Sequence, residues 1–301
     1  MSAIQHPVPS RWLAAAVVFS SALLNGAMSF AQAVKEDTPD PEFKVAARAM
    51  GSDKARDAGR MLTGQAEMDG AETLFTSLLE KGIYPHFTHK ENLASWTKMK
   101  TQVKQKLFNP AKVQAALDLL NQITLRKMNE YATDNYHIVA RYQAMIFVGE
   151  LNQSLPGRQV VPMPEALPVM LKAASDSQLP TAVRVAALLG IKRHADTTLP
   201  DEAKKQVANT MLALVKTKEP AGGESQEGQD WLRRRAADIA ATLGVNAPEV
   251  KEVLAMNAAA AGFPATAASI LVPLPDPAMF NGKKKDGSAP GDDPFGTESP
   301  K

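Results

Sequence analysis

Histidine is the first residue type to consider for metal or acid–base chemistry, and the chain places only two close together, His86 and His89. Residues three apart share one face of a helix, so the pair is a candidate for metal ligation. Gly82 and Pro85 instead predict a loop or the start of a helix here, and no third ligand lies nearby in the sequence. We interpret the pair as surface or packing histidines and predict no metal and no cofactor.

Sequence motifs for other catalytic mechanisms are absent. The chain contains no H-E-x-x-H motif, no G-x-S-x-G nucleophile elbow and no G-x-x-x-x-G-K-[ST] phosphate loop. It also contains no cysteine, which excludes disulfides, thiolate zinc, c-type haem and a cysteine nucleophile. Paired catalytic carboxylates stay open as an alternative, because their spacing is set in space and not along the chain. We predict that the protein is not an enzyme.

A basic face is predicted on the helix expected from Glu91 to Phe108, where lysines are interleaved with apolar residues such as Trp96 and Met99. The lysines are Lys98, Lys100, Lys104 and Lys106. They form a candidate binding patch for an anionic partner or, less favoured, a membrane surface, and an ordinary solvated face is the alternative. A second basic cluster, Arg233–Arg235, is assigned mainly to the repeat described below.

The charge balance argues against a nucleic-acid partner. The 301 residues include 34 lysines and arginines against 32 acidic residues, whereas a nucleic-acid-binding protein would show a larger basic excess. Hydrophobic residues make up 45% of the chain, which is enough to build a folded core. We therefore expect no nucleic-acid partner.

The N-terminus has the three parts of a secretory signal peptide over residues 1–33. Arg11 ends a short positive region, Trp12–Leu24 is largely apolar, and Ala31-Gln32-Ala33 forms a small-residue cleavage site. The apolar run is short for a permanent span of a hydrocarbon core of roughly 30 Å. We expect cleavage near Ala33 and export to the periplasm or the medium, with retention as an anchor as the alternative.

Composition divides the rest of the chain into a linker, a helical body and a tail. Residues 34–42 are acidic and contain two prolines, which predicts a linker. Residues 272–301 are rich in proline, glycine and lysine, which predicts a disordered tail. Between them, apolar residues recur at helical spacing and no segment alternates with the period of a strand. We predict an all-α fold, with an N-terminal helical segment over residues 43–108 and helical repeats over residues 109–271.

Three helical segments of the body share a pattern: an aspartate near the start, then an arginine, then an alanine three residues after the arginine. The aspartate–arginine pairs are Asp134 with Arg141, Asp176 with Arg184, and Asp230 with Arg234. The arginines lie 43 and 50 residues apart, and the polar insertion Gly222–Gly228 accounts for the longer interval. The third copy has a shorter gap between aspartate and arginine, so Arg235 is an alternative to Arg234 there.

A helix pair that repeats at about 40 to 47 residues has the HEAT/armadillo period, and here the chain resembles the HEAT-repeat family. Val183–Gly190 (VRVAALLG) matches the family's second-helix pattern best, and the resemblance covers about Asn109 to Val245. Asn109 is expected to cap the first of these helices, with Pro110 in its first turn. The resemblance implies a short α-solenoid of about three helix pairs, with each arginine reaching an aspartate of its own or a neighbouring repeat. It further implies a non-catalytic protein-binding or scaffolding module of the cell envelope. An exported hydrolase or metal-dependent enzyme is the alternative function.

Overall fold

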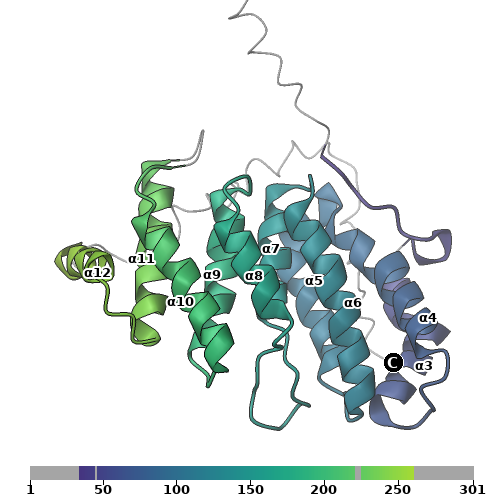
Figure 1. Ribbon diagram of the computed structural model, residues 1–301. Helices are drawn as coiled ribbons and strands as arrows, with labels where there is room; N and C mark the ends of the chain where they lie inside the picture. Colours follow the sequence, from purple (N-terminus) through teal and green to yellow (C-terminus); the bar gives the residue numbers. More distant parts are fainter. Residues whose placement is uncertain (1–33, 45, 221–224, 261–301) are drawn as a thin grey trace, which may run out of the picture. The chain divides into compact units, whose positions relative to one another are not determined.

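The computed structural model describes residues 34–44, 46–220 and 225–260 (Figure 1). Within these ranges the chain is helical without strands, and extended segments meet at two isolated bridges, Lys35 with Tyr136 and Asn152 with Pro162. The predicted all-α fold is confirmed. The predicted signal peptide (residues 1–33) and tail (residues 272–301) lie outside the described residues.

The N-terminal part of the body is built from short helices. They are α2 (Ala46–Gly51), α3 (Asp53–Thr63), α4 (Ala71–Thr76) and α5 (Trp96–Val103), with 3-10 helices at Pro41–Phe43, Tyr84–Phe87 and Lys90–Ser95 and π-helical turns at Ser77–Ile83 and Lys104–Phe108. Both ends of α3 are capped. Ser52 Oγ accepts a hydrogen bond from the backbone N–H of Ala55, and Gly64 ends the helix in the left-handed region with a φ of 77°. These caps fix a helix that is too short to be stable alone.

Buried aromatic rings join this part to the helices that follow. Trp96 stacks on Phe87 with 4.5 Å between ring centroids and meets Phe147 edge-on at 6.4 Å. Phe108 lies 5.9 Å from Phe147 on the same side of the core. Since the buried residues form one continuous cluster, the two segments predicted to divide at residue 108 share a single hydrophobic core.

Three antiparallel helix pairs follow in chain order. They are α6 (Gln114–Thr133) with α7 (Ile138–Gly149), α8 (Ala166–Ser175) with α9 (Thr181–Ala195), and α10 (Asp201–Lys216) with α11 (Gln226–Thr242). The first helices α6, α8 and α10 contact one another in order, and the second helices α7, α9 and α11 do the same (Figure 1). Helix α12 (Pro248–Ala260) packs on α10 and α11. The pairs therefore form two parallel layers of helices.

Small residues let the second helices approach closely. Ala144, Ala187 and Ala236 occupy equivalent places on α7, α9 and α11, and all three are fully buried. Helix α9 is the central helix of its layer and is buried on nearly every side, from Val183 to Ala195. A helix surrounded in this way needs apolar residues around its whole circumference and not along one stripe. This requirement explains the run VRVAALLG in the sequence.

The predicted start of the first pair at Asn109 and Pro110 is wrong, since α6 begins at Gln114. Asn109 instead ends the π-helical turn before it. The backbone N–H groups of Lys112 and Val113 both donate to the carbonyl of Leu62, at 2.8 and 3.2 Å. Because this contact with the end of α3 uses the local donors, residues 110–113 are held out of the helix.

The predicted linker at residues 34–42 is also wrong, since Lys35–Asp40 is bound along the body. The backbone N–H of Lys35 donates to the carbonyl of Asn135, and that of Asp40 donates to the carbonyl of Lys81, both at 2.8 Å. We call Lys35–Asp40 the N-terminal strap. Its acidic side chains, which suggested a solvated linker, are used in contacts with α6 and the 3-10 helices.

Candidate functional site

The second helix of each pair carries an arginine that binds the end of the first helix. In every case Nε donates to a backbone carbonyl two residues before the C-cap of the first helix. The contacts are Arg141 to Ala132 (3.1 Å), Arg184 to Ala174 (3.2 Å) and Arg233 to Val215 (3.0 Å). The last carbonyls of a helix lack intrahelical hydrogen-bond donors and carry partial negative charge. A guanidinium supplies both the missing donor and a positive charge. The repeated arginine is therefore a cap within its own helix pair.

The arginine of the third pair is Arg233, which corrects the prediction of Arg234. Arg234 is exposed, as is Arg235, because a step of one residue turns a side chain by about 100° around the helix. The alanine rule of the sequence fits both registers, since Ala236 follows Arg233 and Ala237 follows Arg234 by three residues, so only the contact with Val215 distinguishes them. With Arg233 in place, the arginines are 43 and 49 residues apart.

The aspartates of the pattern are not equivalent to one another. Asp134 and Asp176 occupy the C-cap positions of α6 and α8, whereas the corresponding C-cap of α10 is Thr217. Asp230 lies inside α11, where its carboxylate is 3.7 Å from Arg233 on the same helix. The feature common to all three copies is therefore the arginine–carbonyl contact, whereas the aspartates differ in position.

The predicted basic patch does not present four free lysines. Lys100 is buried, and its Nζ lies 2.7 Å from Oε1 of Glu150, while Nζ of Lys104 lies 3.1 Å from Oε2 of the same carboxylate. Burial alone would raise the pKa of Glu150, but the two ammonium groups outweigh it and lower that pKa. Lys98 and Lys106 are exposed. Lys100 and Lys104 therefore connect α5 and the π-helical turn to the end of α7 through Glu150.

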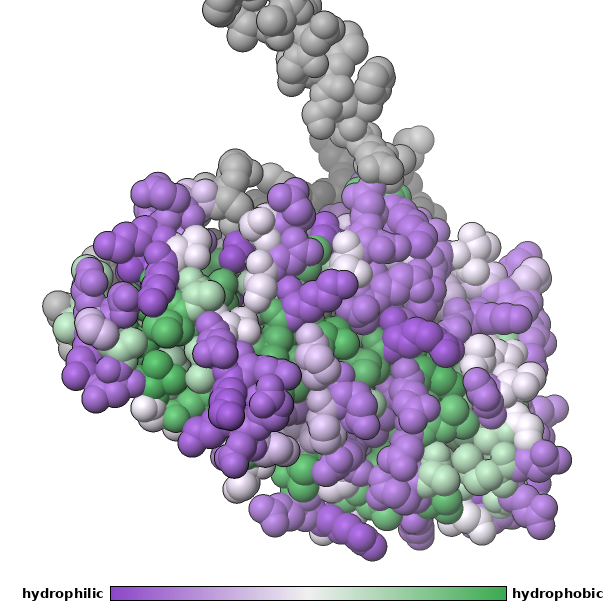
Figure 2. All heavy atoms as spheres, in the orientation of Figure 1, coloured by the Kyte–Doolittle hydropathy of each residue, from purple (hydrophilic) through white to green (hydrophobic). Residues whose placement is uncertain are grey.

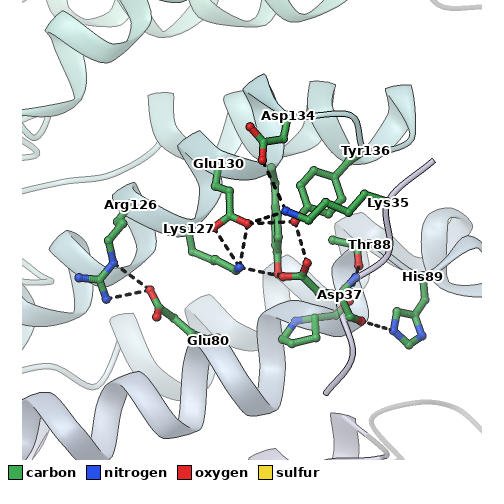
Figure 3. Close-up of polar contacts among 12 residues, drawn as sticks. Lys35, Asp37, Glu80, Thr88, His89, Arg126, Lys127, Glu130, Asp134 and Tyr136 are labelled. Atoms are coloured by element: carbon green, nitrogen blue, oxygen red, sulfur yellow. Dashed lines mark hydrogen bonds and ion pairs between the residues drawn. The ribbon is translucent and has the colours of Figure 1, made fainter. Parts of the chain in front are cut away.

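A cluster of polar side chains forms around Asp37 of the N-terminal strap (Figure 3). The carboxylate accepts from the hydroxyls of Tyr131 (3.0 Å) and Tyr136 (2.7 Å) and lies 2.7 Å from the ammonium of Lys127. Glu130 accepts from Tyr136 at 3.0 Å and pairs with Lys127 at 3.0 Å. The C-terminal half of α6 and the turn after it position all four partners. No motif in the sequence indicates this cluster.

The electrostatics of the cluster favour a charged Asp37 carboxylate and protonated tyrosine hydroxyls. Burial raises the pKa of the Asp37 carboxyl, but Lys127 and the two tyrosine hydroxyls outweigh burial and hold that pKa below its ordinary value. Burial and the neighbouring Asp37 carboxylate raise the pKa of both tyrosines, Tyr131 and Tyr136. Phenols that keep their protons can donate hydrogen bonds to the Asp37 carboxylate, as both hydroxyls do here. The cluster therefore fixes the strap.

Both histidines of the predicted pair bind backbone carbonyls. Nε2 of His89 donates to Asp37 O at 2.7 Å, and Nε2 of His86 donates to Phe43 O at 2.9 Å. Each Nε2 therefore carries a proton and is directed at the strap or at the residues just after it. Across the residues the structure describes, no group of three histidine or carboxylate side chains is placed to hold a metal ion.

A polar hollow of about 460 Å³ lies between α6 and the loop that connects α7 to α8. Its lining residues are Gln114, Asp118, Asn121, Gln122, Gln153, Ser154, Met163 and Glu165. Carboxamides and carboxylates are common on the exposed face of any helix, so no pattern in the sequence predicts this hollow.

No protein-family model, no curated protein and no solved structure matches the chain. In the described ranges, no helix combines the length and the apolar composition needed to cross a membrane.

Proposed function

We propose that the protein is a non-catalytic protein-binding or scaffolding module of the cell envelope, built on HEAT-like helix pairs. One observation carries the proposal: three consecutive pairs repeat the same arginine–carbonyl contact in the same register. Repeats that stack through equivalent contacts produce extended surfaces, and such surfaces serve mainly to bind other macromolecules. A fold alone does not establish a function, so binding itself must be measured.

The layer of second helices offers the candidate binding face. Leu189 on α9 is 38% exposed, although the rest of α9 is largely buried, and Ile138 at the start of α7 is exposed to the same extent. Figure 2 shows one face of the molecule, on which hydrophobic and hydrophilic side chains lie next to one another. Partners that associate and separate bind through surfaces about as apolar as the rest of the protein surface, so the proposed face needs no large apolar patch.

Site-specific photo-cross-linking in the native cell tests the proposal. A photoreactive amino acid at Leu189 should give a discrete cross-linked product, because Leu189 lies on the proposed face. The same amino acid at the exposed Lys205 on α10, in the layer of first helices, serves as the matched control. Failure to cross-link at Leu189, Ile138 and other exposed positions of the second helices would overturn the proposal.

Export to the periplasm or the medium is part of the same proposal and rests on the signal-peptide pattern. The intact mass of protein recovered from its native cells should correspond to a chain that begins at Val34. A full-length mass would contradict cleavage and leave retention as an anchor.

A further inference from the structure

Hydrogen bonds fix both sides of the polar hollow, α6 and the loop that connects α7 to α8. Gln114 Nε2 donates to Oδ1 of Asp118 (2.7 Å) and to the carbonyl of Gln153 (2.8 Å), which ties the loop to α6. In the loop, the backbone N–H of Val161 donates to Oγ of Ser154 at 3.0 Å. The hollow is therefore held open by the protein's own hydrogen bonds before any ligand arrives.

The lining carries negative charge and acceptors. Asp118 and Glu165 are its two formally charged residues, and none of the lining residues is basic. The amide donors of Gln114 are already used by Asp118 and Gln153. Gln122, Gln153 and Ser154 can both donate and accept, so the two carboxylates are the charged groups that the wall offers to a ligand, and carboxylates bind hydrogen-bond donors.

The buried side chain of Asn121 independently indicates a place for a hydrogen-bond donor, because its Oδ1 has no partner among the described residues. Its side chain lines the hollow, and only 1% of the residue is exposed. Nδ2 donates to the carbonyl of Asn152 at 2.7 Å, which fixes the orientation of the amide. Oδ1 then has no hydrogen-bond partner among the described residues. A buried acceptor without a donor is unfavourable, and a donor-bearing ligand would relieve this cost.

From these observations we infer that the hollow binds an organic cation through its ammonium or guanidinium group. The cation donates to the carboxylates of Asp118 and Glu165, and its deepest N–H is directed toward Asn121. A neutral donor such as a sugar hydroxyl would satisfy the acceptors but would leave two carboxylates without a counter-charge. Charge-assisted bonds are about twice as strong as neutral ones, so the lining favours the cation.

The same chemistry has two sources: a free polyamine, or a lysine or arginine side chain of another protein. The hollow falls within the range of roughly 300–1,000 Å³ that small-ligand sites occupy, so it accommodates either. The inference does not depend on the proposed scaffold role, because a free amine could bind to a protein that has no protein partner.

Isothermal titration of the whole recovered chain with two cationic probes tests the inference. The probes are N-acetyl-L-arginine amide, which represents a side chain, and spermidine, which represents a free polyamine. N-acetyl-L-citrulline amide is the neutral control, because it keeps the shape and loses the charge. We expect saturable binding of at least one cation at one site, and binding of citrulline weaker by about tenfold or more.

Variants locate the site. Asp118→Asn with Glu165→Gln removes both charges, keeps the shape of the hollow, and should weaken cation binding by about tenfold or more. Glu202→Gln, an exposed carboxylate on α10, is the matched control and should leave affinity unchanged. Preference for spermidine or for the arginine derivative identifies the source of the cation. Equal binding of arginine and citrulline derivatives, unchanged affinity in the double variant, or no saturation by either cation up to about 10 mM would overturn the inference.

Discussion

Gly149 at the end of α7 and Gly190 within α9 touch through their backbones. A Cβ atom built on Gly149 would lie 2.8 Å from the Cα of Gly190, and one built on Gly190 would lie 2.9 Å from the Cα of Gly149. Real Cβ atoms do not approach backbone so closely, so both residues must be glycine at this spacing. The contact joins the second helices of two adjacent pairs and sets how closely the pairs pack.

Gly190→Ala should destabilise the protein by about 1–3 kcal/mol, the usual cost of overpacking a filled core. The new methyl group would meet Met170 Sδ at 2.1 Å as well as the backbone of Gly149, and backbone has little room to move. The midpoint of urea denaturation measures the effect.

Gly59→Ala is the matched control for this substitution. Gly59 lies inside α3, and a Cβ there meets nothing within 4 Å. Alanine favours helix over glycine by about 0.5–1 kcal/mol, so this variant should be slightly more stable than the wild type. Equal effects of the two substitutions would contradict the close approach of α7 and α9.

Arg184→Met should lower the free energy of unfolding by about 1.5–3 kcal/mol. The guanidinium is 3% exposed and donates to the carbonyl of Ala174, so its loss leaves a buried helix end without its donor. Methionine keeps much of the aliphatic stem, which restricts the loss mainly to charge and hydrogen bonds. Denaturation midpoints compared with the exposed Arg158→Met, expected within about 0.5 kcal/mol of the wild type, check this prediction.

The third pair provides a test of register. Arg233→Met removes the contact with the carbonyl of Val215 and should be clearly destabilising, whereas Arg234→Met changes an exposed side chain and should be nearly neutral. The opposite ranking in the same denaturation assay would restore the register that the sequence comparison selected.

The sequence pattern was sufficient to predict those helices whose position depends on the local spacing of apolar residues. The VRVAALLG run, which the sequence predicts to be the second helix of a pair, forms the central helix α9. The pattern failed at Asn109, because the contact that prevents a helix there comes from the carbonyl of Leu62, far away in the sequence. A local capping rule cannot include such a competitor.

The N-terminal strap was mispredicted for the same physical reason. Asp37 binds Tyr131 and Tyr136, which lie 94 and 99 residues later in the chain. In the sequence, an acidic stretch with prolines is typical of a linker, and nothing local shows that its partners exist. The polar hollow is a similar case, since Asn121 becomes informative only when its burial and its missing donor are known.

Asp37→Asn should release the strap while the helix pairs stay folded. The carboxylate accepts two hydroxyls and pairs with Lys127, and charged hydrogen bonds of this kind contribute about 1.5–3 kcal/mol. Hydrogen exchange at the backbone amides of Lys35 and Asp40 should become faster, whereas the amides of α9 should keep their protection.

Acid should reproduce this release in the wild type. The pKa of Asp37 is lower in the fold than its ordinary value, so its stabilising contribution is complete above the ordinary carboxyl pKa and is lost as the pH falls through the folded pKa. Glu36→Gln is the control for Asp37→Asn. Its exposed side chain keeps an oxygen that accepts from the backbone N–H of Lys90, so exchange at Lys35 and Asp40 should stay slow. Unchanged exchange at Lys35 and Asp40 in the Asp37 variant would show that the cluster does not hold the strap.

His194 should make the protein lose stability between about pH 6.5 and pH 4. It is buried, its Nε2 has no hydrogen-bond partner among the described residues, and burial together with the nearby Arg193 lowers its pKa to about 4. The neutral ring is therefore favoured in the fold, and the unfolded chain takes up a proton first as the pH falls below about 6.5. The loss is absent above that pH and reaches about 3 kcal/mol near pH 4.

His194→Met replaces the ring by a flexible apolar side chain of similar size and removes the titrating group. Its free energy of unfolding should therefore fall less steeply than that of the wild type, with a difference of about 1 kcal/mol developing between pH 7.5 and pH 5.5. Urea denaturation at both pH values measures the two slopes. His86, whose pKa burial also lowers, is present in both proteins and cancels in the comparison. Parallel slopes for the variant and the wild type would mean that His194 is protonated in the fold, and that its surroundings accommodate the charge.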